Sequence, residues 1–276
     1  MTLICDESIG DFLVVRAPFS CGPDNPQSRF IAFTTLAQRS DGGRASYREG
    51  VEEQARSELK FALAPLNLSW LSLEHAAKVV LIPHAIAGER EEGVVRLGDR
   101  GTVLLSHSPV IPADAAIVNK AGHAVAFTTA DCIPVVLASE SRKQIAGIHA
   151  GWRGIAKEVI ENCCDHFASH CGGSLPEDTL AWLGPAIGSD DYEIDSRTRS
   201  ELLTSSHVIA EHFSPTSPGH FLTDLSAMAK SKLVAAGIPP ESMFVQSGST
   251  LSDMRYHSAR RDGIASGRMA TVLGIL

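Results

Sequence analysis

The stretch from residue 113 to residue 150 constrains the fold most, because short apolar runs alternate there with turn residues. The segment ADAAIVNKAGHAVAFTTADCIPVVLAS contains several such runs, and KQIAGIHA follows as a further one. Each run has the length of a strand, and residues such as Asn, Gly and Asp separate them. We therefore predict neighbouring strands of a packed sheet in this part of the chain.

The rest of the chain mixes strands with helices. Further strands are predicted at 12–16, 30–35, 78–84, 180–188, 242–247 and 267–276. Helices are predicted at 51–66, 151–173, 195–213 and 223–238, and a polar loop at 248–266. These elements do not keep a strict strand–helix–strand rhythm, which favours a mixed sheet over a doubly wound one. We predict an α/β fold, a single-domain mixed-sheet α-β sandwich over residues 1–276.

The composition limits the partners. The net charge is −8 and no dense basic run is present, which argues against a nucleic-acid partner. Six cysteines without a CxxC pair favour reduced thiols. The first residues lack the positive charge of a signal peptide, and no apolar stretch reaches the roughly 20 residues that span a membrane. We expect a cytoplasmic protein without a membrane partner, and a monomer because no long apolar stripe stands out.

Two residues at strand ends carry the candidate chemistry. Cys132 precedes the apolar run IPVV, and His149 ends the run IAGIH. Three interpretations are open, namely a metal site, a nucleophile with its base, or two ordinary core residues. A thiolate with imidazoles suits zinc or copper, and a catalytic zinc site needs a third protein ligand. His84, at the end of the strand predicted at 78–84, is the best-placed candidate, and His107 is its rival.

Several motifs resemble one known family. They are TADCIPV (129–135), HAGWRG (149–154), LGPAIG (183–188), YEI (192–194), HSARRDG (257–263) and SGRMA (266–270). Together they resemble the laccase-domain, or multicopper polyphenol oxidoreductase, family, whose members are now described as purine nucleoside phosphorylases. The resemblance runs from about residue 30 to the end of the chain.

The resemblance implies a fold similar to the catalytic domain of cytotoxic necrotizing factors and a His–Cys–His metal site, assigned to zinc and formerly to copper. By position, Cys132 and His149 match two of the ligands. The first ligand normally lies in a Gln-x-His-Gly segment, which maps here to His84 in LIPHAIAG, without the usual Gln and Gly. The family's Thr-Arg-x-Gly-Gly segment reads FTTLAQRSDGG and offers Arg39, and its Cys-Thr reads Ser249-Thr250.

The implied activities are phosphorolysis of adenosine, inosine, guanosine and methylthioadenosine, and deamination of adenosine. Zinc lowers the pKa of water towards about 7, which would provide hydroxide to attack C6 of the purine. Asp131 is a candidate for moving protons, although a turn carboxylate that caps backbone N–H groups is an equal alternative. Phosphate needs cations, for which Arg153 stands at a predicted helix start, and Trp152 could stack on a purine. Further substrate-binding candidates are Arg39, Arg44, Arg260 and Arg261.

Other functions remain open at this point. Cys132 as nucleophile and His149 as base would make a cysteine hydrolase or amidase, for example one that edits peptidoglycan precursors. A non-catalytic metal-binding protein is a further alternative. Polyphenol oxidation with bound copper is disfavoured, because multicopper oxidases need several clusters of histidines and one is visible here.

Overall fold

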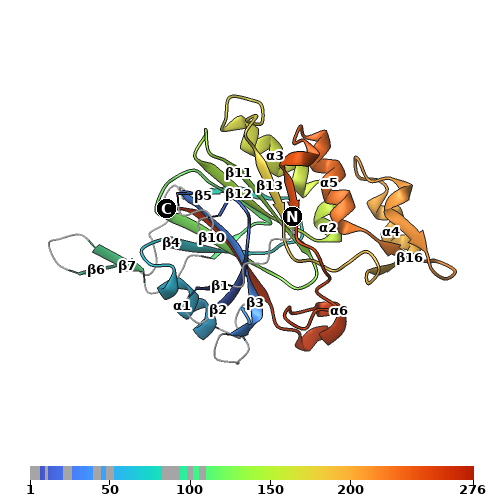
Figure 1. Cartoon of the computed structure of the whole chain (residues 1–276), viewed down its shortest axis with the longest axis horizontal. Helices are drawn as coiled ribbons and strands as arrows, with labels where there is room; N and C mark the ends of the chain where they lie inside the picture. The colour runs from blue at the N-terminus through green and yellow to red at the C-terminus, as the bar shows by residue number, and fades with distance from the viewer. Residues whose placement is uncertain are drawn as a thin grey trace.

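The computed structural model describes residues 7–9, 12–20, 27–39, 45–47, 53–82, 94–97, 102–105 and 110–276. Two large β-sheets form the centre of the molecule, with α1 (Glu53–Ala62) on one side and α2 (Trp152–Ala156), α3 (Val159–Ser169) and α5 (Leu225–Ala235) on the other (Figure 1). The α/β fold with mixed sheets is therefore confirmed. That the chain is one domain stays a prediction.

The first large sheet has seven strands, in the order β1-β2-β3-β18-β10-β4-β8. In the same order, their bounds are Glu7–Ile9, Phe12–Arg16, Phe30–Arg39, Met269–Ile275, His123–Thr129, Asn67–Ser72 and Val110–Pro112. The central pair, β10 and β18, is antiparallel, and its register joins Thr129 to Met269 at one end. The loop that follows β10 and the loop that precedes β18 therefore leave the sheet at the same end of these two strands.

The second large sheet has six strands, in the order β17-β13-β11-β12-β9-β5. In the same order, their bounds are Met243–Val245, Leu180–Leu183, Ile133–Ser139, Gln144–Ala150, Ala115–Val118 and Val79–Ile82. Every residue of β11, β12 and β9 is buried, as expected for strands covered on both faces. The strands predicted between residues 113 and 150 are confirmed, but β10 belongs to the first sheet and the other three to the second.

The two sheets pack closely where Gly147 of β12 faces the first sheet. A Cβ at this position would lie 2.3 Å from Leu273 Cδ2 and 2.9 Å from Phe127 Cε1, so glycine permits the close approach. One buried cluster joins side chains of both sheets, including Val136, Trp182, Phe127 and Leu273. A second cluster joins the six-stranded sheet to α3 and α5, and a third joins α1 to the seven-stranded sheet. The core therefore lies on both sides of each sheet.

Two of the predicted helices are wrong in extent. The helix predicted at 151–173 is broken into α2 and α3 at Glu158, whose φ of 64° is left-handed. The helix predicted at 195–213 is α4 (Ser196–Leu202), followed by turns and the short 3₁₀ helix Ala210–His212. The helix predicted at 223–238 is confirmed as α5, with the side chain of Asp224 as its N-cap.

Smaller elements complete the described chain. Three short strands, β14 (Glu193–Asp195), β16 (His220–Thr223) and β15 (Phe213–Pro215), form a separate sheet, and β6 (Val94–Leu97) pairs with β7 (Thr102–Leu105). The loop predicted at 248–266 contains α6 (Ala259–Asp262) and the 3₁₀ turn Gly263–Ala265. A further 3₁₀ turn, Pro240–Ser242, precedes β17. Within these described segments, no helix combines the length and apolar character needed to cross a bilayer.

Candidate functional site

Cys132 and His149 lie together at one end of the central strands β11 and β12 of the six-stranded sheet. Cys132 immediately precedes β11, and the antiparallel register with β12 pairs Pro134 with His149. Gly151 follows β12, and a Cβ there would lie 2.7 Å from Cys132 Sγ and 3.7 Å from His149 Cε1. The thiol and the imidazole therefore share the space that a side chain at position 151 would need.

A second imidazole, that of His75, lies beside His149. The two ring centroids are 5.3 Å apart and the rings meet edge-on at 86°. His75 stands in the loop between β4 and β5 with a left-handed φ of 51°. The buried carboxylate of Asp114 accepts hydrogen bonds from the backbone N–H groups of His75 and Ala76, at 2.7 and 2.9 Å. This carboxylate holds the loop in the conformation that brings His75 to the site.

One donor near this pair, His75, was not among the predicted ligands. His84 and His107, the two candidates for the first ligand, lie outside the described residues. Sequence reasoning did not consider His75. One sulfur and two imidazoles are donor types that zinc and copper accept. Within the described ranges, no three His, Cys, Asp or Glu side chains come close enough together to hold an ion as they stand. The chemistry of the donor set fits a metal, and binding would require these side chains to move closer together.

Burial sets the protonation of both central residues. Burial, and then Asp131, raise the pKa of the Cys132 thiol to about 11, against the opposing effect of Arg268 and Arg153. Burial first, and then the charges of His75 and Arg268, lower the pKa of His149 to about 3. Nucleophilic cysteines have the opposite shift, towards a stable thiolate. Either role of Cys132, as nucleophile or as metal ligand, therefore requires loss of the thiol proton, whereas the neutral imidazole of His149 is already the form that binds metals.

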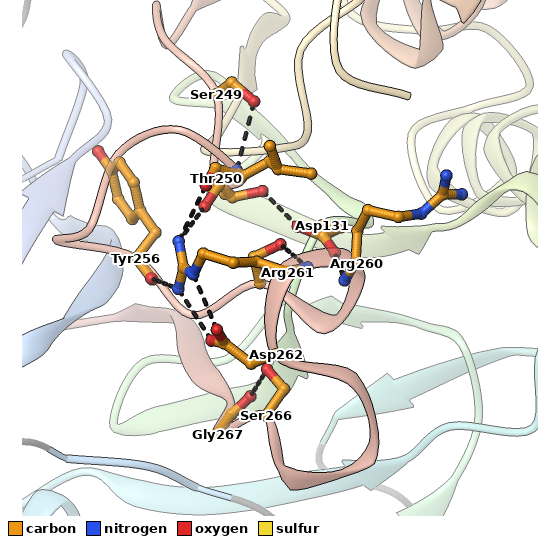
Figure 2. A network of polar contacts seen from close by, with 11 residues as sticks. Asp131, Ser249, Thr250, Tyr256, Arg260, Arg261, Asp262, Ser266 and Gly267 are labelled. Atoms are coloured by element: carbon orange, nitrogen blue, oxygen red, sulfur yellow. Dashed lines mark hydrogen bonds and ion pairs between the residues drawn. The ribbon is translucent and has the colours of Figure 1, made fainter. Parts of the chain in front are cut away.

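Asp131 holds the C-terminal loop against this site. Its φ of 88° is left-handed, a conformation that Asp tolerates better than most residues. One carboxylate oxygen accepts from Thr250 Oγ1 at 2.6 Å and the other from the backbone N–H of Arg260 at 2.7 Å (Figure 2). Both oxygens thus have donors, as in the capping alternative considered above. A role for Asp131 in moving protons stays a prediction.

The two arginines of α6 have different environments. Arg261 donates five hydrogen bonds, to the carbonyls of Thr250, Leu251 and Tyr256 and to the carboxylate of Asp262. These bonds engage all five of its N–H donors, so Arg261 has none left for a substrate. The side chain of Arg260 points away from that network (Figure 2). It donates to the carbonyl of Glu193 at 2.8 Å and lies 5.1 Å from the ring centre of Tyr192.

The remaining predicted residues lie at the start of α2 or outside the described side chains. The exposed guanidinium of Arg153 lies 4.3 Å from the ring centre of the half-buried Trp152. Arg39 ends β3, where its backbone pairs with Phe12, but its side chain is not described. Arg44 lies outside the described residues.

Two residues near the site were missed by sequence reasoning, Tyr192 and Arg268. Burial, followed by the charge of Cys132, raises the pKa of the Tyr192 phenol, which therefore lies close to the thiol. Arg268 acts on both Cys132 and His149, as described above. Both residues belong to motifs that carried the family resemblance, YEI and SGRMA. Those motifs were the signal that could have identified them.

Comparisons with known proteins agree with the resemblance. A purine nucleoside phosphorylase of Xylella fastidiosa (strain Temecula1 / ATCC 700964) is 40% identical over 164 residues, 59% of this chain and 61% of that protein. Adenosine deaminase RL5 of an unknown prokaryotic organism is 33% identical over 165 residues, 57% of this chain and 60% of that protein. The matched part is therefore less than two thirds of the length of either relative.

The fold also has a solved counterpart. The crystal structure of YlmD from Geobacillus stearothermophilus superposes with a TM-score of 0.75 at 22% identity, over 100% of this chain and 99% of that one. This likeness confirms the mixed α/β architecture, while the expected similarity to the necrotizing factor domain stays a prediction. Residues 46–276 match the family model described as multi-copper polyphenol oxidoreductase laccase. Since this match covers most of the 276 residues, the chain belongs to that family.

Proposed function

We propose that this chain is a zinc-dependent purine nucleoside phosphorylase that acts on adenosine, inosine, guanosine and methylthioadenosine and also deaminates adenosine. Relatives named purine nucleoside phosphorylase and adenosine deaminase support this assignment. Copper is the alternative metal, and weak polyphenol oxidation would follow from copper taking the place of zinc. Amide hydrolysis with Cys132 as nucleophile and His149 as base is the less favoured alternative, because an imidazole with a pKa of about 3 is a weak base.

One observation carries the proposal, the convergence of Cys132, His149 and His75 from three separate loops and strand ends. We propose these residues as the metal ligands, with His75 in the position that the sequence predicted for His84. Each side chain leaves the end of a rigid strand or a loop held by Asp114, and such supports restrict the direction of a ligand. The bound metal would supply Lewis-acid activation of water or of a substrate oxygen.

The surrounding residues bind and orient the substrates in this proposal. Arg153 and Arg260 contact phosphate, because each keeps N–H groups without a protein acceptor in the described part of the chain. Trp152 stacks on the purine with the face of its ring opposite the one that Arg153 covers. Asp131 keeps α6 in place and, as the residue next to Cys132, is the proposed group for a proton transfer. Arg39 stays a candidate substrate contact, and Arg261 stabilises the loop that contains α6 through its hydrogen bonds to loop carbonyls.

The proposal is tested by pairing substitutions at the two candidate first ligands. The variants His75→Ala, His84→Ala and Cys132→Ala are purified separately, and the zinc and copper bound per chain are measured for each. Each variant is then incubated with a nucleoside panel, with and without phosphate. We expect His75→Ala and Cys132→Ala to lose metal and turnover, and His84→Ala to keep both. Cys163→Ala, at a buried cysteine of α3, is the matched control for removal of a thiol.

Other results would contradict the proposal. Full nucleoside turnover by wild-type protein stripped of metal would exclude the metal-dependent reaction. Metal loss in His84→Ala with retention in His75→Ala would return the first ligand to position 84. Metal binding without turnover of any nucleoside would leave a non-catalytic metal-binding protein.

A further inference from the structure

We infer that Arg268 is the principal contact for the phosphate oxyanion, and that it forms an anion subsite with Arg153 beside Cys132 and His149. This inference rests on the proposed function for the reaction in which the anion takes part. Arg153 was predicted from the sequence as a cation for phosphate, whereas Arg268 was not among the predicted residues.

The position of Arg268 in the fold brings it to the site. It directly precedes β18, whose first residue, Met269, pairs with Thr129 at the end of β10. Because the two strands are antiparallel, the residue before Met269 lies opposite the turn that leads from Thr129 to Cys132. Arg268 therefore lies at the end of β18 that faces the turn carrying the thiol, although 136 positions separate the two residues in sequence.

The backbone around Arg268 is fixed on both sides. Its N–H donates to Ser46 Oγ at 2.8 Å, and its carbonyl accepts from the N–H of Tyr47 at 3.1 Å. The preceding Gly267 lies against the His257 ring, where a Cβ would come within 2.3 Å of Cε1. The guanidinium thus extends from a held segment, as expected of a preorganised binding group.

Part of the guanidinium is left to bind a ligand. Nη1 donates to the carbonyls of Ser266 and Gly267, at 3.0 and 2.9 Å, which fixes the orientation of the plane. Within the described residues, Nε and Nη2 have no acceptor, and no carboxylate pairs with this side chain. Two free N–H directions on one planar edge match two oxygens of a phosphate.

Arg153 adds the second positive charge. Its side chain makes no hydrogen bond to any described residue, and its guanidinium lies 4.3 Å from the ring centre of Trp152. Arg153 stands two residues after Gly151, whose added Cβ would lie 2.7 Å from Cys132 Sγ, so α2 begins beside the thiol. The carboxylate of Asp131, the residue before Cys132, accepts from Thr250 Oγ1 and from the backbone N–H of Arg260. Two arginine side chains beside this one carboxylate make the three groups net positive on a protein whose net charge is −8, and an anion is the complement.

Direct phosphate binding tests the inference without requiring turnover. Metal-loaded wild type, Arg268→Gln, Arg268→Lys and Arg142→Gln are titrated calorimetrically with inorganic phosphate. Arg142 is an exposed arginine in the turn at the opposite end of β11 and β12, so it is the matched control. We expect Arg268→Gln to weaken phosphate binding roughly 10- to 100-fold, Arg268→Lys to weaken it less, and Arg142→Gln to bind as wild type.

Kinetics on the same proteins separate the anion site from a general defect. In Arg268→Gln the KM for phosphate in phosphorolysis should rise more than the KM for the nucleoside, Arg268→Lys should recover part of that difference, and Arg142→Gln should keep the wild-type values of both. Wild-type affinity for phosphate in both Arg268 variants, or no phosphate binding by wild type, would overturn the inference. Phosphate binding that depends on Arg268 in a protein that turns over no nucleoside would instead overturn the proposed function alone.

Discussion

Asp114 joins the two imidazoles of the candidate site through its own backbone and side chain. Its carbonyl accepts the backbone N–H of His149 at 2.8 Å, while its carboxylate accepts those of His75 and Ala76. The side chain of Asp114 is fully buried. The backbone N–H groups supply the hydrogen bonds that a polar group withdrawn from water requires. The spacing of the two histidines therefore depends on this one residue.

Asp114→Asn should loosen the His75 loop. One carboxylate oxygen becomes an NH₂ group that faces a backbone donor, so the free energy of unfolding should fall by about 2 kcal/mol. Metal affinity should fall as well, because His75 is no longer held near His149. Denaturant unfolding of the metal-free protein and a competitive metal titration measure the two effects.

Asp178→Asn is the matched control for that substitution. Its carboxylate also accepts a backbone N–H, that of Ser141, together with the hydroxyl of Ser139, but it does so at the far end of the β11–β12 hairpin. This variant should lose stability and keep its metal affinity. Equal losses of metal affinity in both variants would refute the specific role of Asp114.

Part of the site was predictable because its residues stand at strand ends. Cys132 precedes the apolar run that forms β11, and His149 lies near the end of the run that forms β12. Hydrophobic periodicity and turn residues mark such boundaries in the sequence. His75 carries no such mark, since it lies in LSLEHAAKVV without Gly or Pro beside it. Its place depends on the carboxylate of Asp114, which is 39 positions away. A contact of this kind is set by tertiary structure and leaves no local pattern.

The same limit explains the broken helix. The apolar spacing of 151–173 continues through Glu158, and no Gly or Pro interrupts it there. The break follows from the left-handed φ of Glu158, whose side chain accepts the backbone N–H of Ser206 at 3.1 Å. The fold class, by contrast, follows from many short apolar runs at once, so single errors do not change it.

Gly151→Ala should displace the thiol of Cys132. The φ of Gly151 is −80°, so alanine is compatible with the backbone, but its Cβ would lie 2.7 Å from Sγ. We expect metal affinity to fall roughly 10- to 100-fold, as for other changes that reorient a ligand. Metal titration measures this effect, and the far-ultraviolet spectrum should stay unchanged.

Gly172→Ala separates this steric effect from a general cost of replacing glycine. Gly172 has a φ of +96° and no heavy atom within 4 Å of its added Cβ. Alanine there should cost about 1 kcal/mol of stability through backbone strain and leave metal binding intact. A Gly151→Ala protein with wild-type metal affinity would show that the thiol has room to move.

Substitutions of the two neighbouring arginines should have different effects. Arg261→Lys loses the planar fork that reaches three carbonyls and a carboxylate, so the free energy of unfolding should fall by about 2 kcal/mol. Arg260→Lys gives up one hydrogen bond, to the carbonyl of Glu193, and should keep its stability. Its KM for phosphate or nucleoside should rise. Thermal unfolding and steady-state kinetics distinguish the two outcomes, and the reverse assignment would make Arg261 the substrate contact.

Lys232 should be the most sensitive single position for stability outside the site. Its side chain is fully buried in α5, where Nζ donates to Glu161, to Ser205 Oγ at 2.9 Å and to the carbonyl of Ser206 at 2.8 Å. Lys232→Met leaves the Glu161 carboxylate without its cation, which should cost about 3–5 kcal/mol. Lys230→Met, at an exposed lysine of the same helix, should change stability by less than about 0.5 kcal/mol.

A double substitution shows whether the loss at Lys232 comes from the abandoned carboxylate. Lys232→Met with Glu161→Leu removes both charges, so the double variant should recover part of the stability lost in Lys232→Met. Ser205 also donates to the carbonyl of Ile155 in α2, so loss of the lysine should also loosen the helix that carries Arg153. Hydrogen exchange at the α2 amides measures that loosening. If Lys232→Met unfolds at the wild-type denaturant concentration, the buried pair contributes no more than the apolar contacts that replace it.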